Sequence, residues 1–443
     1  MIKRMFALFL CLIIFAVPVS VPALAYEPTG INITAKSVVF ASLDTGEVLF
    51  SKQADTKVYP ASITKIMTVT LMLESPKFSP ESKIAMTDEV LKLISGTGSS
   101  VSNLVSGEEI TELDLVYLVL MASFGDCAYL AAIHYGGTVE NFVDMMNKKA
   151  EELGLDNTHY ENPVGLHSEQ NYTTANDTVK LTSYALKNET FKQICETTRY
   201  TVGATQFSKA RTVSTTNFLQ DNTTNYYYAY AKGVKTGYTD EAGRCLVSTA
   251  SYNGYNYICA MFGCPVNPSK RHEFEDSKNL YKWAFNNFEY KEAANTKNPV
   301  CEVGVDLSLD TDHIPLYIEK DFLTVLPKSA DESTILIEPH LNKKTVDAPI
   351  KKGDVLGTAD IIYAEEKIGT VNLISTENVK RSTILYVFRG IKRFFISKYM
   401  VAIYVLIVLL IIAFIIGVIK LNMNSKKRRK VKYIPYNKHD DNR

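Results

Sequence analysis

Hydrophobic and polar positions alternate with different periods along this chain. Residues 37–41 and 47–50 are short, strand-forming runs separated by Asp-Thr-Gly at 44–46, which predicts two strands joined by a tight turn. Residues 112–135 instead carry stretches of helical periodicity. The mixture continues to about residue 292 and predicts an α/β or α+β domain over residues 26–292.

From residue 293 the pattern changes to short runs with strand character, broken by Pro, Gly, Asp and Asn. Because no helix-length periodicity appears before residue 377, we expect a small all-β domain over residues 293–377. It lacks clustered His, Cys or carboxylate side chains, so a spacer or a partner-binding role is expected for it. The runs are residues 301–307, 314–318, 322–326, 335–337, 361–364 and 370–374.

The start of the chain has the pattern of an export signal. Lys3 and Arg4 precede the apolar run 6–19, and the small residues Ala23 and Ala25 follow it. This predicts a cleaved secretory signal over residues 1–25. An uncleaved anchor helix is the alternative, which the short apolar core disfavours.

A second apolar segment, residues 399–419, contains no charged side chain, and a membrane-spanning helix needs about 20 such residues. The basic tail 420–443 is typical of the cytoplasmic side. Basic residues are also frequent in the stalk 378–398, so the distribution of positive charge does not decide the orientation of the membrane helix. The export signal does decide it. It predicts a single pass through the cell membrane with the main domains on the extracytoplasmic face. Residues 379–395 either lie on anionic headgroups or form a solvated linker.

The charge is balanced, with 48 basic and 48 acidic residues, and the basic excess belongs to the stalk and tail. Nucleic acid is therefore not an expected partner. The cysteines beyond the signal show no Cys-x-x-Cys pair, and the histidines are scattered, so neither a disulfide framework nor a metal site is predicted.

The first candidate chemistry lies in residues 59–68, where Pro60 suits the first turn of a helix. Ser62 and Lys65 are three residues apart, and thus share one helix face. A serine is a weak nucleophile until a base takes its proton, and a lysine serves as that base if burial or a neighbouring cation lowers its pKa. Ser-x-x-Lys also occurs by chance on exposed helices, so this pair alone identifies nothing.

A second motif, Lys235-Thr236-Gly237, lies in an extended stretch. Lys235 would receive a substrate carboxylate and depress the pKa of Lys65, with the Thr236 hydroxyl on the same carboxylate. Gly237 would let a ligand approach the strand edge closely. An ordinary exposed hairpin is the alternative.

A third position, Ser123, falls in a short break between two helical patterns, where Asp126 is the expected N-cap of the second helix. An exposed Ser123 would relay a proton between Lys65 and a leaving amine. The alternative is that Ser123 only ends a helix.

Taken together, Ser-x-x-Lys, a serine-containing interhelical loop and Lys-Thr-Gly follow in the order found in penicillin-recognising serine enzymes. Residues 41–49, 165–167, 173–177 and 233–239 resemble more narrowly the low-molecular-weight penicillin-binding proteins that act as D-Ala-D-Ala carboxypeptidases. The resemblance covers nearly the whole chain. It implies an α/β (α+β) penicillin-binding-protein/β-lactamase-like transpeptidase fold, followed by a small all-β domain and a C-terminal transmembrane helix.

The resemblance also implies a reaction without a cofactor. Ser62 would form an acyl-enzyme with the penultimate D-alanine of a peptidoglycan pentapeptide stem, Lys65 would be the general base, and Ser123 would pass the proton to the departing D-alanine. The backbone N–H groups of Ser62 and Tyr238 would form the oxyanion hole. β-Lactams would acylate Ser62, with slow deacylation. Substrate binding is expected of Lys235, Thr236, Gly237, Tyr238 and Arg271.

Two positions depart from the family pattern. The loop motif is usually Ser-x-Asn, whereas Gly125 stands here, and the missing amide would cost a factor on the order of a hundred unless Asp126 or a water substitutes. Relatives often place a carboxylate-binding arginine where Glu273 stands, and Arg271 is the nearest substitute.

Four rival functions share some of these sequence features. A β-lactamase is disfavoured because residues 161–165 lack a Glu-x-x-Leu-Asn arrangement, and a metallopeptidase because no histidines have ligand spacing. A catalytically impaired muropeptide- or penicillin-binding scaffold is motivated by Gly125 and Glu273. A DD-endopeptidase remains the other alternative.

Overall fold

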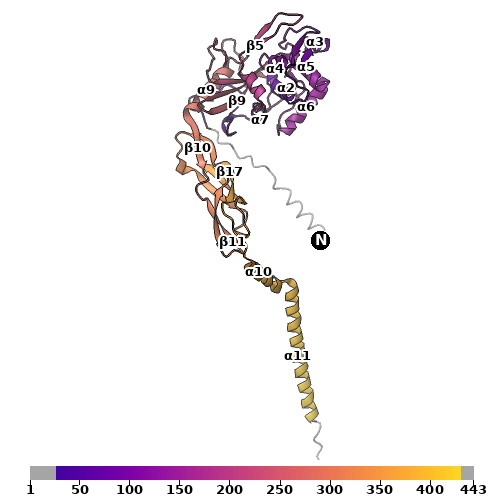
Figure 1. Ribbon diagram of the computed structural model, residues 1–443, viewed down its shortest axis with the longest axis vertical. Coiled ribbons are helices and arrows are strands. Elements are labelled where there is room, and N and C mark those ends of the chain that lie inside the picture. The colour runs from indigo at the N-terminus through magenta and orange to yellow at the C-terminus, as the bar shows by residue number, and fades with distance from the viewer. Residues whose placement is uncertain (1–25, 431–443) are drawn as a thin grey trace, which may run out of the picture. The chain divides into compact units, whose positions relative to one another are not determined.

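The computed structural model describes residues 26–430, apart from the side chains of residues 332 and 424–430. The predicted signal, residues 1–25, and the end of the tail, residues 431–443, lie outside the described residues. The chain separates into two compact units (Figure 1). The first holds the residues up to Asn295 with Asp321–Glu338 and Asp360–Thr370, and the second holds Thr296–Lys320, Pro339–Ala359 and the residues from Val371 onward.

The first unit is built on a five-stranded antiparallel sheet in the order β2-β1-β9-β8-β7. The two strands predicted near the start of the chain are confirmed as β1 and β2. Strand β7 lies at an edge and pairs within the described chain only with β8, so its other edge is open to a ligand backbone. The strands are β1 (Ser37–Ser42), β2 (Val48–Lys52), β7 (Ala231–Thr239), β8 (Gly243–Tyr252) and β9 (Tyr255–Cys264).

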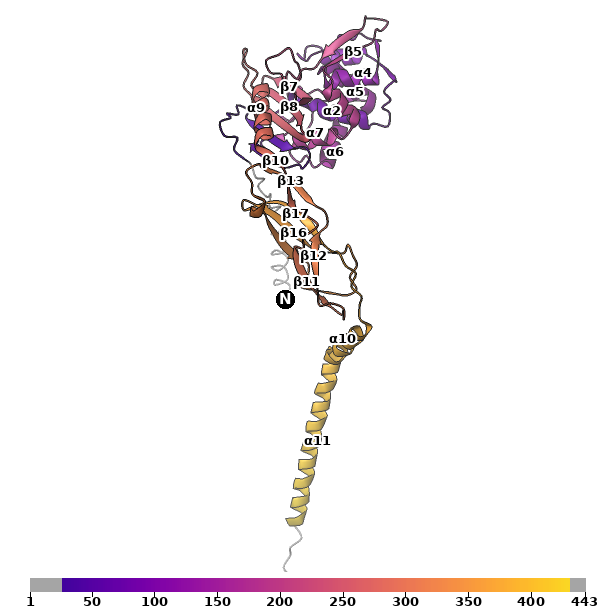
Figure 2. The same cartoon turned by 60° about the vertical axis from the view of Figure 1, so that its left-hand side comes forward.

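Helices cover both faces of this sheet (Figure 2). Successive side chains of a strand point to opposite faces, so Val39 joins the larger core with α2, whereas Val38 and Phe40 pack in the core with Phe274 of α9. The helical elements are η1 (Ala61–Thr64), α2 (Lys65–Glu74), α3 (Asp88–Ile94), α4 (Glu112–Leu120), α5 (Gly125–Gly136), α6 (Val139–Glu152), α7 (Ala175–Ala185), α8 (Glu189–Glu196) and α9 (His272–Asn287).

Short hairpins complete the first unit, and strands dominate the chain between Phe288 and Ser375, as the short apolar runs predict. The hairpins are β3 (Lys83–Ala85) with β4 (Glu109–Thr111), and β5 (Arg199–Val202) with β6 (Arg211–Ser214). A six-stranded sheet has the order β14 (Leu336–Leu341), β16 (Val355–Tyr363), β17 (Glu366–Ser375), β12 (His313–Ile318), β11 (Cys301–Asp306) and β15 (Thr345–Asp347), and β10 (Phe288–Ala294) pairs with β13 (Phe322–Pro327).

Two helices end the described chain, α10 (Thr383–Ile396) and α11 (Lys398–Lys430). Exposed apolar side chains recur along α10 at helical spacing, including Ile384, Phe388, Ile391 and Phe395. The segment Lys398–Met423 of α11 is long and apolar enough to cross a membrane.

Candidate active site

Ser62 and Lys65 lie side by side, although not in one regular helix as expected. Ser62 sits in the 3₁₀ turn η1, and Lys65 is the first residue of α2. Side chains three residues apart eclipse each other in a 3₁₀ turn, so the pairing survives the change of helix type. Lys65 Nζ donates a hydrogen bond to Ser62 Oγ at 2.8 Å and another to the Val164 carbonyl, also at 2.8 Å.

The two lysines of the predicted site are both buried, with Lys65 0% and Lys235 1% exposed. Burial disfavours the charged amine and lowers the pKa of Lys65 to about 7. Burial, and then the positive charge of Lys65, hold the pKa of Lys235 well below its ordinary value. The Lys65 amine is therefore partly neutral near pH 7, which is the form that accepts a proton from Ser62.

The Lys-Thr-Gly motif lies in the edge strand β7, and the burial of Lys235 rules out an exposed hairpin. Lys235 Nζ donates to the Thr236 carbonyl at 3.0 Å, and the Thr236 hydroxyl donates to Thr216 Oγ1 at 2.7 Å. Gly237 passes directly beside the nucleophile, because a Cβ built there would come within 3.2 Å of the Ser62 backbone nitrogen. Any larger residue would push β7 away from the serine.

Ser123 lies in the predicted break between α4 and α5. Its φ of +67° falls in the left-handed region, a conformation that costs a non-glycine residue of order 1–3 kcal/mol and that clusters at functional sites. Among the described residues, no hydrogen bond joins its hydroxyl to Lys65 or Ser62. The structure thus brings Ser62, Lys65 and the β7 motif together, while the proton relay through Ser123 stays a prediction.

Asp126 is not the N-cap of α5 as expected, because the helix starts two residues earlier than that cap implies, at Gly125, with Phe124 as its N-cap. The Asp126 carboxylate is buried and accepts hydrogen bonds from the backbone and hydroxyl of Ser102, at 2.9 and 2.6 Å. Asp126 therefore holds the loop after α3 in place. A carboxylate so engaged does not replace the amide missing at position 125.

The position of that missing amide is occupied. A Cβ built on Gly125 would lie 2.3 Å from the Ser99 hydroxyl oxygen and 2.9 Å from Cδ1 of Ile94. The Gly125 N–H also donates to the Ser100 carbonyl at 2.8 Å, which fixes the loop against the glycine. Glycine at this position is thus matched to the packing of its neighbours.

Arg271 is paired rather than free. Its Nε donates to Glu273 Oε1 at 2.6 Å, and its guanidinium lies 4.9 Å from the ring centroids of Phe218 and Phe274. Glu273 is fully buried, and its Oε2 has no hydrogen-bond partner in the part of the chain that the structure describes. Among the described residues Arg271 makes no hydrogen bond to the β7 motif, so its predicted role in carboxylate binding stays a prediction.

The loop at residues 162–167 contributes to the site through its backbone, which residue patterns do not reveal. The Asn162 side-chain oxygen accepts hydrogen bonds from the N–H groups of Val164, Gly165 and Leu166, and so shapes the turn. Gly165, with φ +87°, lies so close to the nucleophile's turn that a Cβ there would be 1.7 Å from the Ala61 carbonyl oxygen. The turn thereby presents the Val164 carbonyl to Lys65.

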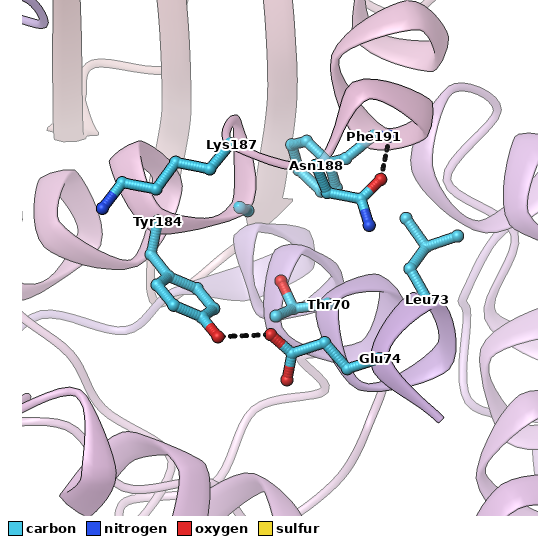
Figure 3. Close-up of a pocket in the computed structure, with 8 residues that line it drawn as sticks. Thr70, Leu73, Glu74, Tyr184, Lys187, Asn188 and Phe191 are labelled. Carbon is cyan, nitrogen blue, oxygen red and sulfur yellow. Dashed lines mark hydrogen bonds between the residues drawn. The ribbon is translucent and has the colours of Figure 1, made fainter. Parts of the chain in front are cut away.

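A cavity of about 270 Å³ lies on the far part of α2, between that helix and the α7–α8 segment (Figure 3). The Tyr184 hydroxyl donates to Glu74 Oε1 at 2.5 Å across it, and the Asn188 side chain caps α8 at the Phe191 N–H. None of the residues predicted to carry chemistry lines this cavity. We therefore place the candidate active site at Ser62, not here.

An antiparallel sheet whose edge strand carries Lys-Thr-Gly beside a Ser-x-x-Lys turn defines a penicillin-recognising serine enzyme. The chain belongs to the D-alanyl-D-alanine carboxypeptidase family Peptidase_S11, whose model matches residues 23–265. The model described as "Penicillin-binding protein 5, C-terminal domain" matches residues 288–381. The predicted family, fold class and enzyme class are confirmed.

Similar proteins span most of the chain. D-alanyl-D-alanine carboxypeptidase DacF of Bacillus subtilis is 30% identical over 79% of this chain and 86% of its own length. A D-alanyl-D-alanine endopeptidase of Pseudomonas aeruginosa is 34% identical over 54% of this chain and 74% of its own length. The crystal structure of penicillin binding protein 5 from Haemophilus influenzae is 27% identical and has a TM-score of 0.65, covering 80% of this chain and 99% of that chain.

Proposed function

We propose that this protein removes the terminal D-alanine from peptidoglycan pentapeptide stems through an acyl-enzyme on Ser62. The observation that carries this proposal is the 2.8 Å contact between Ser62 Oγ and the buried amine of Lys65, whose pKa is lowered to about 7 by burial. A neutral amine at this distance takes the serine proton as the oxygen attacks the carbonyl of the penultimate D-alanine.

The peptide bond then breaks, the terminal D-alanine leaves as its amine, and Ser123 is assigned the proton transfer from Lys65 to that amine. The backbone N–H groups of Ser62 and Tyr238 stabilise the oxyanion. Water hydrolyses the ester, which releases the shortened stem and restores the serine. The same acylation by a β-lactam leaves a slowly hydrolysed ester.

The β7 motif supplies the substrate's orientation. Lys235 and the Thr236 hydroxyl, both on the edge strand β7, receive the terminal carboxylate, and Gly237 keeps that strand close to Ser62. Arg271 is the further candidate for this carboxylate, once its pair with Glu273 rearranges. An extended peptide would add to the edge of β7 as another strand.

We also propose a location for the activity. After signal removal at residue 25, the catalytic domain 26–292 and the β-rich domain 293–377 lie on the extracytoplasmic face of the cell membrane. The basic stalk 378–398, with the amphipathic helix α10, lies at the lipid surface. Residues 399–419 span the bilayer, and the basic tail 420–443 is cytoplasmic.

The test uses the full-length protein in detergent, with diacetyl-L-lysyl-D-alanyl-D-alanine as substrate and fluorescent penicillin as the acylating probe. D-Alanine release and labelling that both vanish in Ser62→Ala support the proposal. Penicillin labelling at Ser62 with neither D-alanine release from this peptide nor cleavage of a cross-linked muropeptide would instead support the impaired scaffold. Retention of release by Ser62→Ala would overturn the serine mechanism.

A DD-endopeptidase activity is the second candidate, favoured by the 34% identity to the Pseudomonas aeruginosa endopeptidase. It uses the same acyl-enzyme and differs only in the leaving group, a cross-linked side-chain amine in place of D-alanine. The two activities are distinguished by measuring kcat/KM on a cross-linked muropeptide dimer and on a pentapeptide. The substrate with the higher kcat/KM identifies the main activity.

A further inference from the structure

A cavity of about 310 Å³ lies where β7 ends and turns into β8. Its lining includes two lysines, two glutamates and two tyrosine rings. These six residues are Lys36, Lys57, Tyr59, Glu169, Tyr172 and Glu241.

Two segments that reach this cavity also contact the Ser62–Lys65 pair. One is the loop from residue 163 onward: Val164 accepts a hydrogen bond from Lys65, and three residues later the His167 ring meets the Tyr59 ring edge-on, with centroids 4.6 Å apart. Tyr59 then lines the cavity together with Glu169. The cavity is thus one aromatic pair away from the Ser62–Lys65 turn.

The other segment is β7 itself. Gly237 lies against the Ser62 backbone, and the strand continues to Thr239 before the turn that carries Glu241. The orientation of substrate used here rests on the proposed function. In that orientation the terminal carboxylate lies at Thr236 and the scissile carbonyl lies at the Tyr238 N–H. The stem peptide then runs along β7, and its residues closer to the N-terminus lie nearer the turn that carries Glu241.

The residue before D-Ala-D-Ala in a peptidoglycan stem is a diamino acid. An extended residue advances the chain by roughly 3.3–3.6 Å, so on this orientation the residue lies just beyond Tyr238, on the side of the turn that carries Glu241. The far end of its side chain carries an ammonium, and in diaminopimelate a carboxylate as well.

The cavity has groups that match both charges. Glu169 and Glu241 are exposed, and neither forms an ion pair or a hydrogen bond with another side chain in residues 26–430, so their carboxylates are available to an ammonium. Lys57 Nζ is held 3.8 Å from the centroid of the Tyr172 ring, which fixes a cation at the cavity wall. Lys36 adds a second cation.

We propose that this cavity is a specificity subsite for the diamino acid of the stem, in which Glu169 and Glu241 bind the side-chain ammonium and Lys57 binds the carboxylate that distinguishes diaminopimelate from lysine. The subsite selects among stems, and acyl transfer at Ser62 does not depend on it.

The experiment compares kcat/KM of the full-length protein in detergent on three peptides. These are L-Ala-γ-D-Glu-meso-diaminopimelyl-D-Ala-D-Ala, the same stem with lysine, and the same stem with Nε-acetyl-lysine. The expected order is diaminopimelate, then lysine, then acetyl-lysine. Glu241→Gln and Glu169→Gln should each lower kcat/KM on the two cationic stems by roughly two- to fivefold, the range of one exposed ion pair.

Lys57→Gln should lower only the diaminopimelate value, so that the lysine stem becomes an equally good substrate. Glu140→Gln, an exposed carboxylate on α6 outside the cavity, is the matched control. The rate of penicillin acylation reports whether each variant keeps an intact Ser62 site.

Equal kcat/KM on the three stems, or an equal loss on all three in the Glu variants, would overturn the subsite. Penicillin acylation without release from any stem would overturn the carboxypeptidase proposal instead. In that case the three peptides, used as competitors of penicillin acylation, still decide the subsite: the same order of inhibition supports it, and equal inhibition rejects it.

Discussion

Lys65 Nζ lies 2.8 Å from Ser62 Oγ, and the two residues belong to consecutive elements, the turn η1 and the helix α2. Their proximity is local, but the chemistry of the pair is not. The Val164 carbonyl, nearly a hundred positions further along the chain, accepts a hydrogen bond from the Lys65 amine and holds it in place. The surrounding core shields that amine from water. The base is thus made by the tertiary fold, because an exposed lysine would remain protonated at neutral pH.

The first prediction concerns pH. Burial lowers the pKa of Lys65 to about 7, and only the neutral amine accepts the Ser62 proton. The second-order rate constant for penicillin acylation should therefore rise about tenfold per pH unit below pH 7 and level off above it. Stopped-flow acylation between pH 5 and pH 9 measures this limb. A rate constant that is flat from pH 5 to pH 7 would contradict the assignment of Lys65 as base.

The second prediction separates the function of Lys65 from its effect on folding. In Lys65→Met, an apolar side chain of similar length replaces a buried amine, so acylation should fall by about 10²–10⁴-fold while the melting temperature does not decrease. Thermal unfolding and penicillin labelling of the same sample measure both quantities. Lys92→Met, at an exposed position of α3, is the control and should change neither. A marked loss of stability in Lys65→Met would show that its hydrogen bonds are structural.

The site was predictable where its signal was local. Ser62, Lys65 and the β7 motif could be found because each is a short pattern of side chains. Whether Lys235 was buried depended on packing that spacing does not encode, and the Val164 carbonyl is a backbone group that no residue type marks. These two features needed the structure.

The misplaced N-cap of α5 has a physical cause that lies outside the helix. The helix α5 begins one residue before the expected cap because the Asp126 carboxylate, besides accepting from the N–H of the next residue, Cys127, bonds to Ser102, a contact distant in sequence. A good capping residue was thus used for a tertiary contact. By contrast, several strands of the β-rich region were predicted from short runs with strand character bounded by turn residues, whereas β10 and β15 were not among those runs.

The third prediction concerns Gly125. Restoring the asparagine usual in the family, by Gly125→Asn, should fail to raise activity, because its Cβ would meet the Ser99 hydroxyl at 2.3 Å. We expect a destabilisation of about 1–3 kcal/mol, the usual cost of overpacking. The double variant Gly125→Asn with Ser99→Gly removes the closest clash and should recover most of that stability. Urea unfolding and D-alanine release of the single and double variants test this, and a stable, more active single variant would contradict it.

The fourth prediction concerns the pair of Arg271 with Glu273. Arg271→Ala leaves a fully buried carboxylate without its cation and should destabilise the protein by about 3 kcal/mol. The double variant Arg271→Ala with Glu273→Gln removes that charge and should recover much of the loss. Urea unfolding of the two variants measures this cycle.

The same two variants decide what Arg271 does for the substrate. If Arg271 also receives the terminal carboxylate, the KM for the pentapeptide stays raised by about tenfold in the double variant even though its stability is recovered, because one charge-assisted contact is worth about 1.4 kcal/mol. This is the expected result. Penicillin labelling confirms that Ser62 remains reactive in both variants. A KM that returns to the wild-type value together with stability would assign Arg271 to the fold, and would leave Lys235 and Thr236 to hold the carboxylate by themselves.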